Sequence, residues 1–310
     1  MHYALGIDLG GTNIKAVCVT PHGQVLSRQT FRTQDNPAMP WKQHVRDYLG
    51  TLKASHGQNP QWVGMAAPGV AWPDGRDIWW MQGKMLGLEG FDWREYLGLE
   101  TNFWTLNDAH AAMLAEVWQG AAKGIRNVVL LTLGTGVGGA ILIDGRLLQG
   151  PLGRAGHLGH LSLDIDGPLD LTRTPGSLEY AIGNYSLKDR SKGRFASTRQ
   201  LVQAHRSGDT HATELWLRSV KSLACAIASI INVLDVEVVI IGGGIALAGQ
   251  ALFDPLAKFM DEVEWRPHNK RVPIVPAELG QWAGALGAAW YVIQQNNRQS
   301  PQTLPSEANP

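Results

Sequence analysis

Two short glycine turns carry residues whose types and spacing could bind phosphate. The first is residues 8–12 (DLGGT) and the second is residues 134–139 (GTGVGG). Backbone N–H groups in such turns can approach phosphate oxygens closely, because glycine has no side chain to block them. One such turn is more often only a tight turn. Two related turns, from two apparent half-molecules, could face each other across a cleft and hold a polyphosphate from both sides.

Two further sites suggest nucleotide binding and acid–base chemistry. Gly242-Gly243-Gly244 follows a predicted strand, where it could let an adenine or ribose lie against the backbone or serve only packing. Asn107 and Asp108 lie where a predicted strand runs into a predicted helix, whose N-terminus favours negative charge. Taken alone, Asp108 also fits a helix-capping aspartate.

The elements that would position these residues alternate between strands and helices. The expected strands are 3–8, 14–19, 62–67, 102–106 and 236–241, and the expected helices are 41–55, 109 to about 120, about 212 to 234 and 281–295. Residues 7–19 also align with 131–143, with Leu, Gly and Ala at the same offsets, which suggests an internal duplication. We therefore expect an α/β fold in which ligands lie at the carboxyl ends of strands.

The length of 310 residues indicates two domains with a cleft between them. We expect a smaller N-terminal α/β domain at 1–118, completed by a C-terminal helix at about 284–297 that packs back onto it. The larger α/β domain is expected at 119–283. Residues 298–310 are polar and rich in proline, and we expect them to be a disordered tail.

Composition excludes several classes of partner. Lys plus Arg and Asp plus Glu number 27 each, so no net charge attracts nucleic acid or an anionic membrane. The N-terminus lacks the pattern of a signal peptide, and we find no run of about 18 apolar residues, so we expect a cytoplasmic protein. Cys18 and Cys225 lie in apolar segments and are expected to be buried thiols, which leaves no disulfide framework and no four-cysteine zinc site.

Taken together, the motifs resemble those of the ROK family, the bacterial sugar kinases and related repressors within the actin-like ATPase superfamily. The resemblance covers almost the whole chain and includes 8–12, 133–139, 232–235 (NVLD), 241–244 and 284–289 (GALGAA). It implies two ribonuclease H-like domains with ATP and a small-molecule sugar between them, closing on binding. Homodimers are common in the family, so a homodimer is compatible with the resemblance.

The resemblance changes the interpretation of Asp108. Asn107-Asp108-Ala109 matches the family's Asn-Asp-Ala motif, whose Asp is the catalytic base that accepts the proton of the sugar hydroxyl. Asn107 would then hydrogen-bond sugar hydroxyls, and Asp8 would hold Mg²⁺ through water. The residues expected to bind ATP are Asp8, Gly10, Gly11, Thr12, Lys15, Gly134, Thr135, Gly136, Gly138, Gly243 and Gly244.

The expected sugar site departs from the family pattern. The family has Gly-x-x-Gly-Glu-x-Gly-His where this chain has residues 153–160 (GRAGHLGH), so His157 replaces a sugar-binding Glu. A neutral imidazole offers one donor and one acceptor, so its preferred hydroxyl pattern must differ from that of a carboxylate. The remaining expected sugar contacts are Pro68, Gly69, Asn107, His160 and Glu179. His110 stands where the family often has Asn.

A second departure concerns zinc. The family carries a structural zinc bound by one His and three Cys, and the three cysteine positions here hold Asp170, Thr172 and Ser177. Thiolates dominate structural zinc sites, and oxygen ligands substitute poorly for them. We therefore expect no structural zinc. His160 is then either a sugar ligand or a core histidine.

The segment 78–84 also differs from the family pattern, and its Trp79 and Trp80 either stack on the sugar or belong to the core. The resulting hypothesis is an ATP-dependent sugar kinase of carbohydrate metabolism that acts on a hexose or hexose derivative. A catalytically impaired sugar-binding or sensing protein is the alternative, motivated by His157 and His110. A repressor is disfavoured because the first strand begins at residue 3 and no basic excess exists. The sequence specifies neither the sugar nor the hydroxyl that is phosphorylated.

Overall fold

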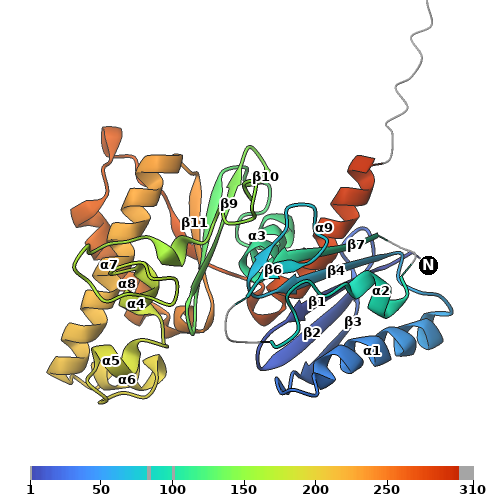
Figure 1. Ribbon diagram of the computed structural model, residues 1–310. Coiled ribbons are helices and arrows are strands. Elements are labelled where there is room, and N and C mark those ends of the chain that lie inside the picture. The colour runs from blue at the N-terminus through green and yellow to red at the C-terminus, as the bar shows by residue number, and fades with distance from the viewer. Residues whose placement is uncertain (1, 82–84, 100–101, 300–310) are drawn as a thin grey trace, which may run out of the picture. The chain divides into compact units, whose positions relative to one another are not determined.

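The computed structural model describes residues 2–81, 85–99 and 102–299. The chain divides into two compact units, the first made of Met1–Leu114 with Gly284–Pro310 and the second of Ala115–Ala283. In Figure 1 the first unit runs from blue to teal and includes the red helix, and the second runs from green to orange. Within the described residues each unit contains one five-stranded sheet, so the predicted α/β class is confirmed.

The sheet of the first unit has the strand order β3-β2-β1-β4-β7. Its strands are β1 (Ala4–Leu9), β2 (Asn13–Val19), β3 (Val25–Arg32), β4 (Trp62–Ala67) and β7 (Asn102–Asn107). The first three strands form an antiparallel meander, whereas β1, β4 and β7 run parallel. Asp8 pairs with Ala66, and Ala67 pairs with Asn107. The carboxyl ends of the three parallel strands therefore meet at one edge of the sheet.

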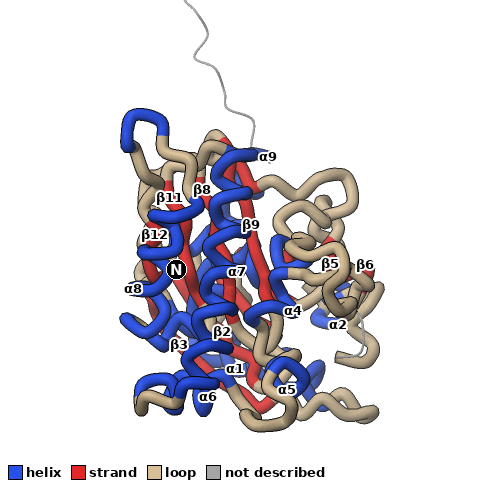
Figure 2. The backbone as a smooth tube through the Cα atoms, turned by 90° about the vertical axis from the view of Figure 1, so that its left-hand side faces the viewer, coloured by secondary structure: helices blue, strands red, loops and turns tan. Residues whose placement is uncertain are grey.

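Helices and a small hairpin complete this unit. They are α1 (Pro40–His56), α2 (Trp93–Leu97), α3 (Asp108–Gln119) and α9 (Ala283–Gln299), with β5 (Val70–Ala71) pairing β6 (Ile78–Trp80). In α1, Pro40 suits the first turn, and Gly57 ends the helix with a φ of 72°. The buried residues of α1 include Trp41 and Val45, one turn apart, and they belong to the same core as the β1 side chains. In Figure 2 much of the chain around β5 and β6 is loop.

Helix α9 packs unusually close to the sheet because glycines lie at its contacts. A Cβ on Gly6 of β1 would lie 1.9 Å from the Ala285 carbonyl oxygen, and one on Gly64 of β4 would lie 2.0 Å from that of Ala288. A Cβ on Gly287 itself would lie 1.7 Å from the Ala111 carbonyl oxygen in α3. The C-terminal helix thus packs onto the N-terminal sheet and α3 at three positions where only glycine fits.

The second unit repeats the same sheet pattern, with the order β10-β9-β8-β11-β12. Its strands are β8 (Val128–Leu133), β9 (Val137–Ile143), β10 (Arg146–Leu147), β11 (Val238–Gly242) and β12 (Ile274–Pro276). As in the first unit, the central strand β8 is antiparallel to the next strand and parallel to β11, which is in turn parallel to β12. The β1–β2 and β8–β9 hairpins are the two segments that sequence self-similarity had identified.

The helices of the second unit surround a large apolar core. They are α4 (Leu178–Ile182), α5 (Leu187–Arg190), α6 (Thr198–Arg206), α7 (Thr210–Leu234) and α8 (Gln250–Val263), with short 3₁₀ helices η1 (Leu158–His160), η2 (Gly244–Ala248), η3 (Pro267–Asn269) and η4 (Gly280–Trp282). Helix α7 packs against α4, α6 and α8. Its buried side chains share one core with those of β8, β9 and β11.

Helix α7 is also the one helix among the described residues that is long and apolar enough to cross a membrane. This corrects the expectation that the chain has no such stretch, since Arg218 and Lys221 interrupt the apolar residues of α7 without making the helix polar overall. Half of its apolar window is buried inside the structure. A core helix passes the same test of length and composition, and Trp216 and Leu223 are both fully inside the core.

Most expected elements are present, and the corrections are at their ends. The expected strand 236–241 begins at Val238, because Asp235 ends α7 in a left-handed conformation and Val236-Glu237 connects the two elements. Helix α9 extends to Gln299, past the expected start of the tail at 298, and residues 300–310 lie outside the described residues. β3, α6 and α8 were not predicted. β3 shows mixed burial at the edge of its sheet, so its sequence lacks a clear alternation.

Candidate active site

The candidate catalytic carboxylates lie at the edge where β1, β4 and β7 end. Asp8 is near the end of β1, and Asp108 begins α3 directly after β7. The two charges repel each other, which contributes to a raised pKa for Asp108. Gly69 follows β4 at the same edge and has a φ of 98°; a Cβ there would lie 2.5 Å from the Trp80 carbonyl oxygen. This edge brings together three of the segments that the sequence had singled out.

Asp108 has the electrostatic environment of a proton acceptor. Desolvation by the surrounding protein, followed by repulsion from Asp8, raises its pKa from 3.8 to about 6, against hydrogen bonds from backbone N–H groups and Asn107. The residue still reaches solvent. A carboxylate can touch water on one side while low-dielectric protein on the others disfavours its charge. Such a group is ionised at neutral pH, yet is a stronger base than a free aspartate.

Asn107, and not Asp108 alone, caps α3. The Asn107 Oδ1 accepts hydrogen bonds from the backbone N–H of Ala109 at 2.9 Å and of His110 at 3.3 Å, while its Nδ2 donates to the Gly69 carbonyl at 2.9 Å. Asp108 Oδ1 accepts a second bond from Ala109 at 2.8 Å. The buried Asn107 amide therefore ties the loop after β4 to the start of α3. One of its two amide hydrogens is already used for this contact.

The Asp8 carboxylate is held on two sides. Lys15 Nζ lies 3.4 Å from Asp8 Oδ2, and burial raises the pKa of Asp8 while Lys15 opposes that shift. A Cβ on Gly284 would lie 2.7 Å from Asp8 Cγ, so the start of α9 approaches the carboxylate at a distance that requires glycine. The positive end of the helix dipole there favours negative charge. Lys15, which the sequence assigned to nucleotide binding, is therefore an ion-pair partner of Asp8.

The first glycine turn is supported by a residue that the sequence analysis missed. The buried Thr33, directly after β3, donates from Oγ1 to the Gly10 carbonyl at 2.5 Å, and its N–H donates to the Thr12 carbonyl at 3.0 Å. Gly11 has open space where a Cβ would be. Because β3 itself was not predicted, no sequence signal indicated that Thr33 lies beside this turn.

The second glycine turn is fixed from within its own unit. Glu179 Oε2 accepts from the Val137 N–H at 2.8 Å, and a Cβ on Gly136 would lie 2.3 Å from the same oxygen. Asn184 N–H donates to the Gly134 carbonyl at 3.0 Å. Glu179, expected as a sugar contact, is buried in α4 and uses one carboxylate oxygen to hold this turn. A Cβ on Gly134 would meet open space.

A cavity of about 790 Å³ adjoins this turn in the second unit. It contains three of the expected nucleotide-binding residues, Gly134, Thr135 and Gly244. Sequence reasoning missed its other polar lining residues, which are Asn184, Ser197, Thr198, Arg199, Gln203 and Arg206. Gly243 lies beside β8 with a φ of 84°, where a Cβ would lie 2.3 Å from the Leu133 carbonyl oxygen, whereas Gly244 has open space. Apart from Asn184, which lies between α4 and α5, the missed residues lie on α6 or directly before it, and α6 had not been predicted.

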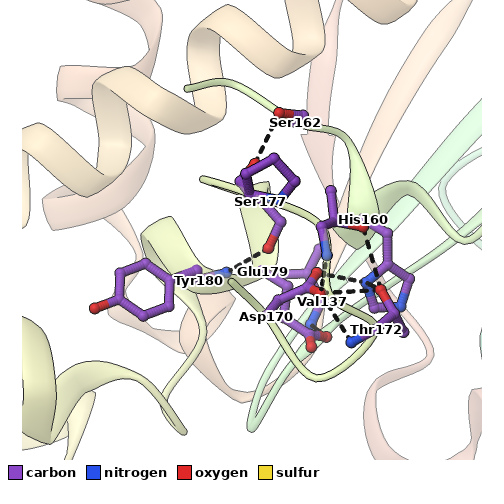
Figure 3. A network of polar contacts seen from close by, with 10 residues as sticks. Val137, His160, Ser162, Asp170, Thr172, Ser177, Glu179 and Tyr180 are labelled. Carbon is purple, nitrogen blue, oxygen red and sulfur yellow. Dashed lines mark hydrogen bonds and ion pairs between the residues drawn. The ribbon is translucent and has the colours of Figure 1, made fainter. Parts of the chain in front are cut away.

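The histidine segment contains two imidazoles with defined partners. His157 Nδ1 lies 3.1 Å from the Arg154 carbonyl oxygen, and His160 Nδ1 lies 2.8 Å from Asp170 Oδ2. An antiparallel bridge between Ser162 and Ser177 brings the segments that carry His160 and Glu179 side by side (Figure 3). These expected sugar residues are therefore gathered in one part of the second unit.

Four other expected positions have different surroundings. His110 is buried within α3, at 1% exposure, so it can influence a ligand only from beneath the surface. Trp79 packs against Trp72 with ring centroids 5.3 Å apart, while Trp80 is 39% exposed. Pro68 is partly buried directly after β4. Residues 82–84, the end of the unusual tryptophan segment, lie outside the described residues.

The residues at the family's zinc positions do not fit a zinc ion. Asp170 Oδ1 accepts bonds from Thr172 N–H at 2.8 Å, Thr172 Oγ1 at 2.9 Å and Thr174 N–H at 2.9 Å, while Oδ2 accepts from His160. Ser177 Oγ accepts from the Tyr180 N–H and caps α4. In the described part of the chain, no group of three or more His, Cys, Asp or Glu could hold a metal. Of the three residues at the cysteine positions only Asp170 is anionic, and its oxygens already accept four hydrogen bonds, while hydroxyls are poor zinc ligands.

Comparison with known proteins identifies the class. The ROK family model matches residues 4–295, and the chain belongs to the ROK family. The predicted fold, with two ribonuclease H-like units of the actin-like ATPase kind, is confirmed by its structural relatives.

Particular relatives resemble the chain over nearly its whole length. An N-acetylmannosamine kinase from Pasteurella multocida is 32% identical over 293 residues, which cover 93% of this chain and 95% of that protein. The structure of a ROK hexokinase from Thermus thermophilus has a TM-score of 0.83 at 28% identity, covering 96% of this chain and 99% of the other. A ROK glucokinase from Streptomyces griseus, in complex with glucose and AMPPNP, has a TM-score of 0.75 at 25% identity, covering 94% and 99%.

Proposed function

We propose that this protein is an ATP-dependent kinase that phosphorylates a hydroxyl of a small sugar, with Asp108 as the general base. The observation that carries the proposal is the position of Asp108, a solvent-accessible carboxylate with a raised pKa at the start of α3. It lies at the same sheet edge as Asp8 and the loop of Gly69. The kinase names of relatives that match over more than nine-tenths of the chain support the same activity.

The proposed step is a direct transfer of the γ-phosphoryl group. The sugar oxygen forms a bond to the γ-phosphorus while the bond between that phosphorus and the β,γ-bridging oxygen breaks, and ADP leaves with the bridging oxygen. The proton of the attacking hydroxyl moves to a carboxylate oxygen of Asp108. Such transfers depend on positioning and charge stabilisation more than on covalent chemistry. Asn107 contributes by tying the start of α3, where Asp108 lies, to the loop of Gly69.

ATP is proposed to bind through the cavity of the second unit and the glycine turns. The cavity of about 790 Å³ is large enough for a nucleotide, and Gly134 and Gly244 expose backbone without obstruction. The AMPPNP bound to the Streptomyces griseus relative supports ATP as the donor. Asp8 is the residue that would hold Mg²⁺ through water, and the ion would neutralise phosphate charge. Gly10, Gly11 and Thr12 would line the phosphates.

The sugar is proposed to contact His157, His160 and Glu179 in the second unit, with Pro68, Gly69 and Asn107 in the first. The relatives named hexokinase, glucokinase and N-acetylmannosamine kinase support a hexose or a hexose derivative. We further propose a cytoplasmic enzyme that acts without nucleic acid and is capable of forming a homodimer. The boundary between its two functional domains would lie within α3 and again at the start of α9, as the division into compact units supports.

The direct test measures ADP release with ATP and a panel of hexoses and N-acetylhexosamines. We expect turnover with at least one sugar, and a loss of about 10²- to 10⁴-fold in kcat for Asp108→Asn, the usual contribution of a general base. Asp47→Asn is the matched control, because it makes the same charge change on the exposed face of α1. Near-normal turnover in Asp108→Asn would refute the base assignment. Calorimetric sugar binding without ADP release by the wild type would instead support the sensing alternative.

A further inference from the structure

One buried carboxylate organises the loop that follows His160. The Asp170 side chain is 0% exposed, and its two oxygens accept hydrogen bonds from different parts of the loop (Figure 3). Oδ1 accepts from Thr172 and Thr174, whereas Oδ2 accepts from His160 Nδ1 at 2.8 Å. Burial favours the neutral acid, yet the bonds from His160, Thr174, Ser177 and Thr172 together lower the pKa of Asp170 to about 2. This carboxylate is therefore ionised and acts only as an acceptor.

The directions of these bonds determine where the ring hydrogen of His160 lies. Because Asp170 Oδ2 can only accept, the hydrogen between the two atoms is on Nδ1. Thr172 Oγ1, 3.2 Å from the same nitrogen, gives its own hydrogen to Asp170 Oδ1 and so offers Nδ1 only a lone pair. In the neutral imidazole, hydrogen on Nδ1 leaves a lone pair on Nε2.

A metal ion would produce the opposite arrangement. A histidine bound to zinc through one nitrogen uses that lone pair for the metal and carries hydrogen on its other nitrogen. His160 would then present an N–H donor at Nε2. With a carboxylate in place of the metal, the same nitrogen of the neutral ring is an acceptor.

We propose that Asp170 is a positioning residue of the sugar site, which replaces a metal ion as the partner of His160 Nδ1 and makes Nε2 accept a hydrogen bond from a sugar hydroxyl. This inference rests on the proposed function for the identity of the ligand. The position of His160 beside the Glu179 segment, with its side chain 28% exposed, gives the ring access to a ligand. The sugar must therefore offer a hydrogen at this contact.

Asp170→Asn tests the proposal with little change of shape. The Oδ1 position receives N–H groups from Thr172 and Thr174, so the amide oxygen should stay there and the NH₂ group should face His160. The amide would donate to Nδ1, and the hydrogen of the ring would move to Nε2. We expect KM for the sugar to rise about tenfold, because the hydroxyl that donates to Nε2 would meet an N–H instead, and an unmade hydrogen bond costs on that order. KM for ATP should change less than threefold.

Fluorinated sugars give a sharper readout, because fluorine replaces a hydroxyl without carrying a hydrogen. Among monodeoxyfluoro analogues, the one altered at the His160 contact should lose the most kcat/KM with the wild type. With Asp170→Asn the loss of kcat/KM for the same analogue should be at least threefold smaller. In that variant Nε2 carries a hydrogen, so the contact no longer requires a hydrogen on the sugar. Asp166→Asn is the matched control, since Asp166 is exposed on the same loop, and it should behave as the wild type. Equal fluorine effects in the wild type and Asp170→Asn would overturn the proposal.

Two measurements on the wild type do not depend on activity. Nitrogen NMR at about pH 9, well above the ordinary imidazole pKa of about 6.5, should show His160 with hydrogen on Nδ1 only, using His160→Gln for assignment. Metal analysis should find no stoichiometric zinc. Hydrogen on Nε2, or one bound zinc per chain, would overturn the proposal even if Asp170→Asn fails to fold. If no sugar is phosphorylated or bound, both the proposed function and the sugar contact of His160 are refuted. The NMR measurement still decides which ring nitrogen of His160 carries the hydrogen.

Discussion

Asp108 differs from an ordinary surface aspartate in how strongly it holds a proton. Its pKa is raised to about 6, first by desolvation and then by the charge of Asp8. A base must be ionised to accept the hydroxyl proton, so the active form of the enzyme decreases as pH falls through this value. We expect kcat/KM for the sugar to be constant near neutral pH and to fall about tenfold per pH unit below about pH 6.

A pH profile of kcat/KM with saturating ATP checks this prediction. An acid limb near the ordinary aspartate pKa of about 3.9 would mean that the environment of Asp108 does not raise its proton affinity in solution. Asp8→Asn provides a second measurement, because the charge of Asp8 contributes to the raised pKa of Asp108. Removing that charge should lower the pKa of Asp108, which carbon NMR of its carboxyl group measures without requiring turnover.

At the level of single residues, the sequence predicted identities better than contacts. Asp8 and the glycine turns were selected because their residue types fit phosphate and Mg²⁺ binding, whereas Asp108 was selected as the base only through the family resemblance. Asn107 was assigned to the sugar, and its cap on the Ala109 and His110 N–H groups was not predicted, although that cap is local. Its bond to Gly69 could not be predicted, because that loop follows another strand. Thr33 and the polar residues that line the cavity of the second unit were missed because such residues have no distinctive spacing in the sequence.

Among the secondary-structure elements, α9 shows how glycines determine packing. Gly287 allows the helix to approach the Ala111 carbonyl, and a Cβ there would lie 1.7 Å from that oxygen. Because the obstacle is backbone and not a flexible side chain, α9 or α3 must shift. We expect Gly287→Ala to lower the free energy of unfolding by about 1–3 kcal/mol or more, the usual cost of overpacking a core.

Gly50 offers the matched control for this change. It lies on the exposed face of α1, where a Cβ meets nothing within 4 Å. Gly50→Ala should raise the free energy of unfolding by about 0.5–1 kcal/mol, because alanine has the higher helix propensity. Urea unfolding of both variants gives the comparison. A Gly287→Ala variant as stable as the wild type would mean that α9 is not held in this close contact.

Across the whole molecule, the repeated pattern predicted more than any single element did. The similarity of 7–19 to 131–143 corresponds to the β1–β2 and β8–β9 hairpins, each in a sheet of the same order. The family resemblance then supplied what periodicity could not, namely the kind of fold that the two units share. Neither the internal repeat nor the family resemblance predicted the hydrogen bonds of Asp170. Its partners His160, Thr172 and Thr174 reach it only after the loop has folded back. The sequence showed only that the cysteines were absent.

The proposed function assigns nucleotide binding to the second unit and the base to the first, so we expect that the two can be lost separately. Gly244 lines the cavity of the second unit, and a side chain there would enter open space without displacing protein atoms. Gly244→Val should therefore fold but exclude the nucleotide, weakening ATP binding at least tenfold. Asp108→Asn, in the first unit, should bind ATP normally while losing turnover.

Thermal unfolding with and without ATP distinguishes the two variants. A ligand at 100 times its Kd stabilises the folded state by about 2.7 kcal/mol, so the wild type and Asp108→Asn should both gain several degrees in Tm. Gly244→Val should gain little at the same concentration, although its Tm without ATP should be close to that of the wild type. If ATP stabilises Gly244→Val as much as the wild type, the nucleotide binds elsewhere and the cavity has another role. If ATP no longer stabilises Asp108→Asn, this carboxylate contributes to nucleotide binding. That result would contradict the prediction, because a base that acts only on the sugar hydroxyl should not affect ATP binding.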